Sequence, residues 1–138
     1  MGRTVNDGLT IICEWAETSG TSLYTLVGTR VGKQRIPTVS PPFTNTVAAI
    51  VVFPLAVIQD SFDTDVQDGR YAFRCYGGTA NVDSASAVFR AVYDRFHKAH
   101  GDTTTGGIVL SEFEEGQPMI DPDEGWPLYV ATFRIKTT

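Results

Sequence analysis

The longest apolar run of the chain, VAAIVVFPLAVI at residues 47–58, does most to limit the possible folds. A helix that crosses a membrane needs about 20 apolar residues, so this run indicates a protein core instead. Its first part, residues 47–53, is apolar at every position and rich in Val and Ile, which predicts a strand covered on both faces. Pro54 cannot donate a hydrogen bond within a sheet and predicts an edge or a bulge at the far end.

Three further segments have the pattern of strands. Residues 70–76 place Tyr71, Phe73 and Cys75 on one face, which is the alternation of a half-buried strand. Residues 107–114 and 126–136 predict two more strands. The connection between these two is long for a hairpin loop, and we expect it to project from the sheet.

Two segments have apolar side chains at helical spacing. They cover residues 7–18 and about 83–100, and LYTLVGTRV after the first predicts one or two further helical turns. The sequence therefore predicts a single α+β domain over residues 1–138. In this fold a four-stranded, mainly antiparallel sheet has two principal helices packed on it.

The charge of the chain is negative and unevenly placed. The net charge is −5, and two segments, 60–68 and 112–124, hold ten of the sixteen carboxylates. The carboxylates in question are Asp60, Asp63, Asp65 and Asp68, then Glu112, Glu114, Glu115, Asp121, Asp123 and Glu124. A chain this acidic is not expected to bind nucleic acid tightly, because binding to phosphates needs clustered Lys and Arg. Solubility alone is an alternative explanation of both segments.

None of the candidate nucleotide-binding or metal-binding motifs has the residue pattern that such a site requires. The turn at Gly77 and Gly78 lacks the G-x-G-x-x-G spacing of a dinucleotide site, and Asp83 at the helix start would repel a phosphate. GTRVGKQ is one residue too short between its glycines for a phosphate loop, and DTDVQDG departs from a calcium loop at its ligand positions. His97 and His100 are better explained as cations at a helix end than as metal ligands. The sequence therefore predicts no cofactor, no metal and no catalytic residue.

The two cysteines, Cys13 and Cys75, lie far apart within patterned segments. We expect two buried free thiols in a reducing compartment, although a disulfide remains an alternative.

In the order of its segments, the whole chain resembles the tail terminator, or tail completion, proteins of long-tailed bacteriophages. The resemblance rests on LYTLVGTRV, a proline-containing loop, the strand VAAIVVFPL and a strand ending in RYAFRCYGG. The helix VDSASAVFRAVYDRFHKAH and the closing strands GGIVLSEFEEGQPMIDPDEGWPLYVATFRI follow. The most telling part is the aromatic and basic strand that enters a glycine turn and continues as an Ala-rich helix ending in His.

The resemblance implies a structural virion protein and not an enzyme. Proteins of this family form rings, typically of six subunits, at the head-proximal end of the tail tube. They stop tail polymerisation and provide the surface on which the filled head docks. The implied partners are the tail tube protein and the head–tail connector or stopper, with DNA passing through the channel without specific binding and no membrane involved. Assembly would take place in the host cytoplasm. The alternatives are a connector or stopper of the neck and a small ligand-binding α+β domain.

Within such a ring, the two acidic segments suggest different roles. Asp60, Asp63, Asp65 and Asp68 are the candidates for the channel, where carboxylates would keep DNA from sticking. Met119 and Ile120, with Glu112 and Glu114 on the same segment, are the candidates for docking to a partner protein. The strand at 47–53 and the segment 126–135 carry more apolar surface than two short helices can cover. We therefore expect a neighbouring subunit to complete the burial through a heterologous interface.

Overall fold

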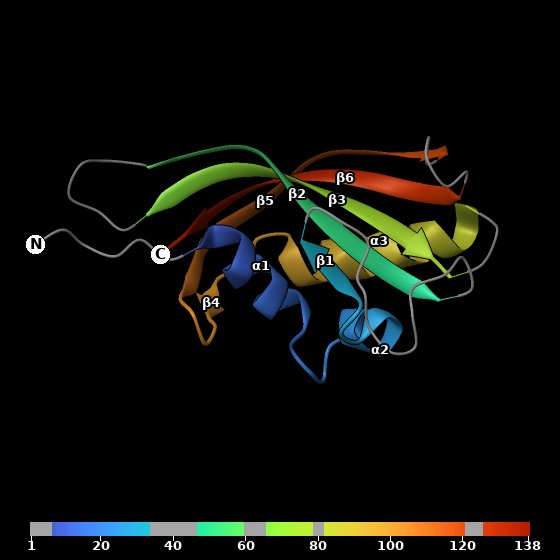
Figure 1. Ribbon diagram of the computed structural model, residues 1–138, viewed down its shortest axis with the longest axis horizontal. Helices are drawn as coiled ribbons and strands as arrows, with labels where there is room; N and C mark the ends of the chain where they lie inside the picture. The colour runs from blue at the N-terminus through green and yellow to red at the C-terminus, as the bar shows by residue number, and fades with distance from the viewer. Residues whose placement is uncertain (1–6, 34–46, 60–65, 79–81, 121–125) are drawn as a thin grey trace, which may run out of the picture.

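The centre of the molecule is one six-stranded sheet in the order β1-β2-β3-β6-β5-β4 (Figure 1). It is seen in a computed structural model that describes residues 7–33, 47–59, 66–78, 82–120 and 126–138. The strands are β1 Val31–Lys33, β2 Ala48–Gln59, β3 Gln67–Gly77, β4 Gly101–Asp102, β5 Gly107–Ile120 and β6 Pro127–Thr137.

The predicted four-stranded sheet is wrong, because six strands form a mixed sheet that curls into a half-barrel. The four long strands pair antiparallel in the order β2, β3, β6, β5. The sequence predicts antiparallel pairing for most of the sheet but no order of strands. The two additional strands lie at the edges, where β1 pairs parallel with β2 and β4 pairs antiparallel with β5. They have three and two residues, which is too short for an alternating pattern to reveal them in a sequence.

The long strands also extend further than their patterns predict. Strands β2 and β3 continue together into the segment expected to be an acidic loop, and pair as far as Gln59 with Gln67. Pro54 is accommodated by a register shift between Pro54 and Ala56, which confirms the predicted bulge. Strand β5 runs to Ile120, so the first part of the expected projecting connection is strand paired with β6.

Three helices cover one face of the sheet, α1 Gly8–Ala16, α2 Ser22–Val27 and α3 Val82–Phe96 (Figure 1). The first two are separate because Thr21 caps α2 by accepting a hydrogen bond from the Tyr24 amide. Helix α3 ends earlier than predicted, because Lys98 takes a left-handed conformation and its amide bonds to the Ser111 carbonyl of β5. Within the described ranges, no helix has the length and apolar character needed to span a membrane.

The main core lies between the helices and the sheet. Phe73 of β3, Phe96 of α3 and Phe133 of β6 are completely buried, and the ring centre of Phe73 lies 4.9 Å from that of Phe96 and 5.2 Å from that of Phe133. Buried aromatic clusters of this kind dominate core energetics, and truncating one such ring to Ala costs about 3–5 kcal/mol.

A second, smaller cluster lies on the other face of the sheet. Its buried members are Ala49, Val51, Tyr76 and Leu128. Strand β2 contributes to both clusters, since Ile50 and Val52 belong to the main core. The predicted burial of this strand on both faces is therefore confirmed.

Candidate functional site

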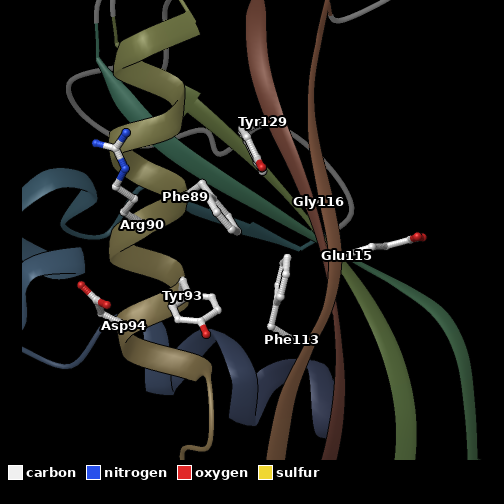
Figure 2. A pocket seen from close by; sticks show the side chains of 8 residues that line it. All are labelled: Phe89, Arg90, Tyr93, Asp94, Phe113, Glu115, Gly116 and Tyr129. Carbon is white, nitrogen blue, oxygen red and sulfur yellow. The ribbon is translucent and has the colours of Figure 1, made fainter.

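An aromatic groove lies between helix α3 and strands β5 and β6, and has a volume of about 690 Å³ (Figure 2). The residues that line it are Phe89, Arg90, Tyr93, Asp94, Phe113, Glu115, Gly116 and Tyr129. We call this feature the aromatic groove. Four of the eight lining side chains are aromatic, which suits the groove to binding apolar groups.

The walls of the aromatic groove are aromatic rings that contact one another. Phe89 stacks on Tyr129 with ring centres 4.2 Å apart and planes inclined by 16°. Phe113 lies 5.6 Å from Phe89 and 5.4 Å from Tyr93. Phe113 also contacts the buried Phe133 at 5.5 Å, so the groove is continuous with the main core. These contacts hold the rings in place, although each groove ring keeps part of its surface exposed.

Charged side chains stand around the rim of the groove and not in it. In Figure 2, Arg90 and Asp94 point away from it on the helix side, and Glu115 points away on the far side of β5. No residue in the described part of the chain forms an ion pair or a side-chain hydrogen bond with any of these three groups.

Gly116 allows strand β5 to pass close beneath Tyr129. A Cβ atom at this position would lie 2.8 Å from Cε1 of Tyr129 and 3.2 Å from the Val130 carbonyl oxygen. Since real Cβ atoms do not approach that closely, the position of the Tyr129 ring depends on a residue without a side chain.

The outer edge of β5 is covered only at its start. Strand β4 pairs with Gly107 and Ile108, and the Lys98 amide bonds to the Ser111 carbonyl. The Phe113 amide then donates to Nδ1 of His97 at 3.2 Å, so the imidazole carries its proton on Nε2. From Glu114 to Ile120, no residue that the structure describes pairs with this edge.

The residues predicted for docking lie on this same strand. Met119 and Ile120 are 38% and 59% exposed at the end of β5. Glu114 is bonded to Arg70 at 2.8 Å, and Glu112 pairs in register with Arg134. The structure thus places all four residues on β5. Of the two carboxylates, that of Glu114 forms an ion pair, and the two apolar side chains are partly exposed.

The channel candidates are divided by the structure. Asp60, Asp63 and Asp65 lie outside the described residues. Asp68 belongs to β3, where the Arg134 guanidinium donates to both of its carboxylate oxygens at 3.1 and 2.7 Å. These hydrogen bonds hold the pKa of Asp68 below its ordinary value of 3.8.

Gly77 and His97 have structural roles here. Any side chain on Gly77 would collide with the backbone of Ser84 and Ala85, so this glycine lets β3 and α3 approach each other. His97 stacks on Tyr93 with ring centres 4.6 Å apart. Among the described residues, no group of three or more His, Cys, Asp or Glu side chains is placed to hold a metal ion.

The two cysteines are buried free thiols, as predicted. Burial raises the pKa of Cys13 to about 12, against a smaller opposing effect of Lys33, and burial also raises the pKa of Cys75. Since the thiolate is the reactive form, both side chains are inert core residues.

Sequence reasoning missed the aromatic groove. Phe89 belongs to the apolar side chains at helical spacing in residues 83–100, and that pattern indicates a core position. The helical spacing of Phe89 and Tyr93 is the available signal for a second aromatic stripe. Phe113 and Tyr129 come from strands that meet only in the folded sheet, so no local pattern joins them to the helix.

Comparison with known proteins identifies a relative of this fold. No protein-family model matches the chain, and neither does any curated protein. Among solved structures, the chain is similar to one in the "Virion of native gene transfer agent (GTA) particle", with a TM-score of 0.64. The two sequences are 19% identical, and the match covers 94% of this chain and 93% of that one. Over almost its whole length, the chain therefore has the fold of a virion component.

Proposed function

We propose that the protein is a structural component of a phage particle that forms a ring at the head-proximal end of the tail tube. There it stops tail polymerisation and offers the surface on which the head docks. The observation that carries the proposal is the likeness in fold to a chain of a gene transfer agent virion, because it extends over nearly all of both chains. The order of segments in the sequence, which resembles tail terminators, supports the same role.

Ring formation requires one surface of the subunit to fit a different surface of the next. Six subunits is the number that the resemblance implies. The curved sheet leaves Leu55, Val109 and Ile120 at least half exposed, and these apolar side chains are available for such contacts. The proposed neighbours along the particle are the tail tube protein on one side and the connector or stopper on the other, with Met119 and Ile120 in one of these contacts.

The proposed channel surface is the acidic segment 60–68, which follows β2 in the sequence. In the ring, Asp60, Asp63 and Asp65 would repel passing DNA. Asp68 adds less charge than the sequence implies, because Arg134 neutralises it. Replacing the first three by Asn, with Asp68 left intact, is expected to preserve assembly and slow DNA delivery. Normal infection by that variant would remove the channel assignment.

The role places the protein in the virion, at the junction of tail and head. Electron microscopy of particles whose copy of this protein carries a fused fluorescent or gold-binding tag tests this directly. We expect one ring of label at the junction. Label along the tail, at its distal tip or absent from the particle would contradict the proposal, and label on the head side of the junction would favour a connector or stopper.

The competing class is a small ligand-binding domain, which the aromatic groove favours. A ligand of that class would stabilise the isolated subunit by binding in the groove. A subunit that binds a small aromatic molecule there, and that is absent from purified particles, would support this alternative.

A further inference from the structure

We propose that the open edge of β5 and the aromatic groove together bind an extended segment of a partner protein. In that segment, apolar side chains alternate with basic ones. The proposal rests on the geometry of this edge and does not depend on the ring or on its position in a virion.

The backbone is the first part of the site. Between the Phe113 amide, which is bonded to His97, and Pro118, which has no amide hydrogen, lie the four residues Glu114–Gln117. On the outer side of these four, none of the described residues pairs with β5. An unpaired strand edge binds extended peptides through main-chain hydrogen bonds, and the two flanking features limit such pairing to this short stretch.

The aromatic groove determines which side chains fit one face of the added strand. Side chains of a strand alternate between its two faces. On the helix side of the sheet, they would enter the groove and contact Tyr93, Phe113 and Phe89 (Figure 2). Because these rings present apolar surface that is only partly buried, this face favours apolar side chains.

Glu115 determines the chemistry on the opposite face. Its carboxylate points away from the aromatic groove (Figure 2), beside a hollow of about 130 Å³ lined also by Gln117, Val130 and Thr132. The negative charge of Glu115 acts electrostatically on Arg70. The Arg70 guanidinium, however, forms its hydrogen bond with Glu114 and not with Glu115. An added strand therefore meets an unpaired carboxylate here, and opposite charges on adjacent strands stabilise pairing.

The Glu115 carboxylate also determines the charge of the partner segments that can bind. An exposed strand edge invites association with other edges, and charged side chains on it discourage acidic or purely apolar partners. Glu115 thus admits a basic partner and repels an acidic one, which is discrimination by an attractive and a repulsive contact together.

The probe that tests this is a blocked pentapeptide, acetyl-Lys-Val-Lys-Val-Lys-amide, titrated into the full chain and followed by nuclear magnetic resonance of backbone amides. Two matched peptides serve as controls, one with Glu in place of each Lys and one in which every backbone amide is N-methylated. We expect millimolar binding of the first peptide, with shifts centred on Glu115, Gly116 and Gln117, and no binding of the other two.

Variants of the chain test the charge preference separately from the fold. Glu115→Gln is expected to weaken binding of the Lys peptide about two- to fivefold. Glu115→Lys should reverse the preference, so that the Glu peptide binds better. Asp83→Asn makes the same charge change on the exposed first turn of α3, outside the aromatic groove lining, and should leave affinity unaltered. The thermal unfolding of each variant is also measured, and affinities are compared only among variants with the same melting temperature.

Three results would overturn the proposal. The first is that millimolar Lys peptide causes no shifts of backbone amide resonances. The second is that the shifts are centred on residues other than Glu115, Gly116 and Gln117. The third is that the N-methylated peptide binds as tightly as the Lys peptide. A loss of preference in Asp83→Asn equal to that in Glu115→Gln would also overturn the proposal. None of these results bears on where the protein lies in a particle, so they leave the proposed ring untouched.

Discussion

Trp15 of α1 and Arg95 of α3 each donate a side-chain hydrogen bond to the backbone carbonyl of the other. The indole Nε1 of Trp15 donates to the Arg95 carbonyl at 2.9 Å, and Nε of Arg95 donates to the Trp15 carbonyl at 2.9 Å. The guanidinium lies over the indole, 3.8 Å from the ring centre. Two hydrogen bonds and a cation–π contact therefore join helices that are 80 residues apart in sequence.

We expect Trp15→Phe to destabilise the fold by about 1–3 kcal/mol, because it removes the indole donor and weakens the cation–π contact. Urea unfolding measures this as a lower midpoint. Arg90→Lys, on the exposed side of α3, should change stability by less than about 0.5 kcal/mol. Equal effects of the two substitutions would show that the paired contact contributes nothing.

Gly116→Ala is expected to displace the Tyr129 ring from Phe89. The added Cβ would lie 2.8 Å from Tyr129 Cε1, and overpacking of this kind costs about 1–3 kcal/mol. Thermal unfolding should show the loss, and the ring resonances of Tyr129 and Phe89 should shift. Gln117→Ala, at the next and exposed position, is the control. Unchanged ring resonances in Gly116→Ala would contradict this account.

Asp68 should make the stability of the fold depend on pH in the acidic range. Its pKa is lowered in the folded state by hydrogen bonds from Arg134, so the ionised form contributes stability above pH 3.8. That contribution is lost as the pH falls through the lower folded-state pKa. Asp68→Asn should therefore be less stable than the parent at pH 7, with the difference shrinking below pH 3.8. A difference in unfolding free energy that is constant with pH would contradict the pairing.

Much of the central sheet could be predicted, because its long strands carry local patterns. The alternation at Tyr71, Phe73 and Cys75 gave the buried face of β3, and all three are buried. Strand ends were harder to predict. Strand β5 continues through Glu114 to Ile120 with polar residues and a proline, since pairing with β6 holds it extended whatever its composition.

The short edge strands and the candidate sites depend on contacts between residues that are distant in the sequence, and a local sequence pattern cannot predict such contacts. Strand β1 forms because Val31 lies beside Ile50 in parallel register. The charge of Asp68 suggested a free acidic side chain, but its partner Arg134 comes from a strand 66 residues later. Met119 and Ile120 are candidates because two large apolar residues between Pro118 and Pro122 are unusual in a polar segment. Both side chains are exposed, and their role in docking stays a prediction.

Replacing Met119 and Ile120 by Ser is expected to weaken docking to the tail tube or connector. The isolated subunit should keep its stability, since exposed side chains contribute little to folding. Co-sedimentation with purified tails that lack this protein measures docking. Leu26→Ser removes an apolar side chain of α2 that is as exposed as Met119, and this variant should dock normally. Normal docking by the double variant would remove these two residues from the interface.

The length of the tail tests the proposed function most directly. Electron microscopy of tails assembled without this protein should show tubes that exceed the normal length and vary among particles, because nothing stops polymerisation. Supplying the purified protein during assembly should restore one length and heads joined to it. Tails of normal length in its absence would contradict a role in terminating the tail.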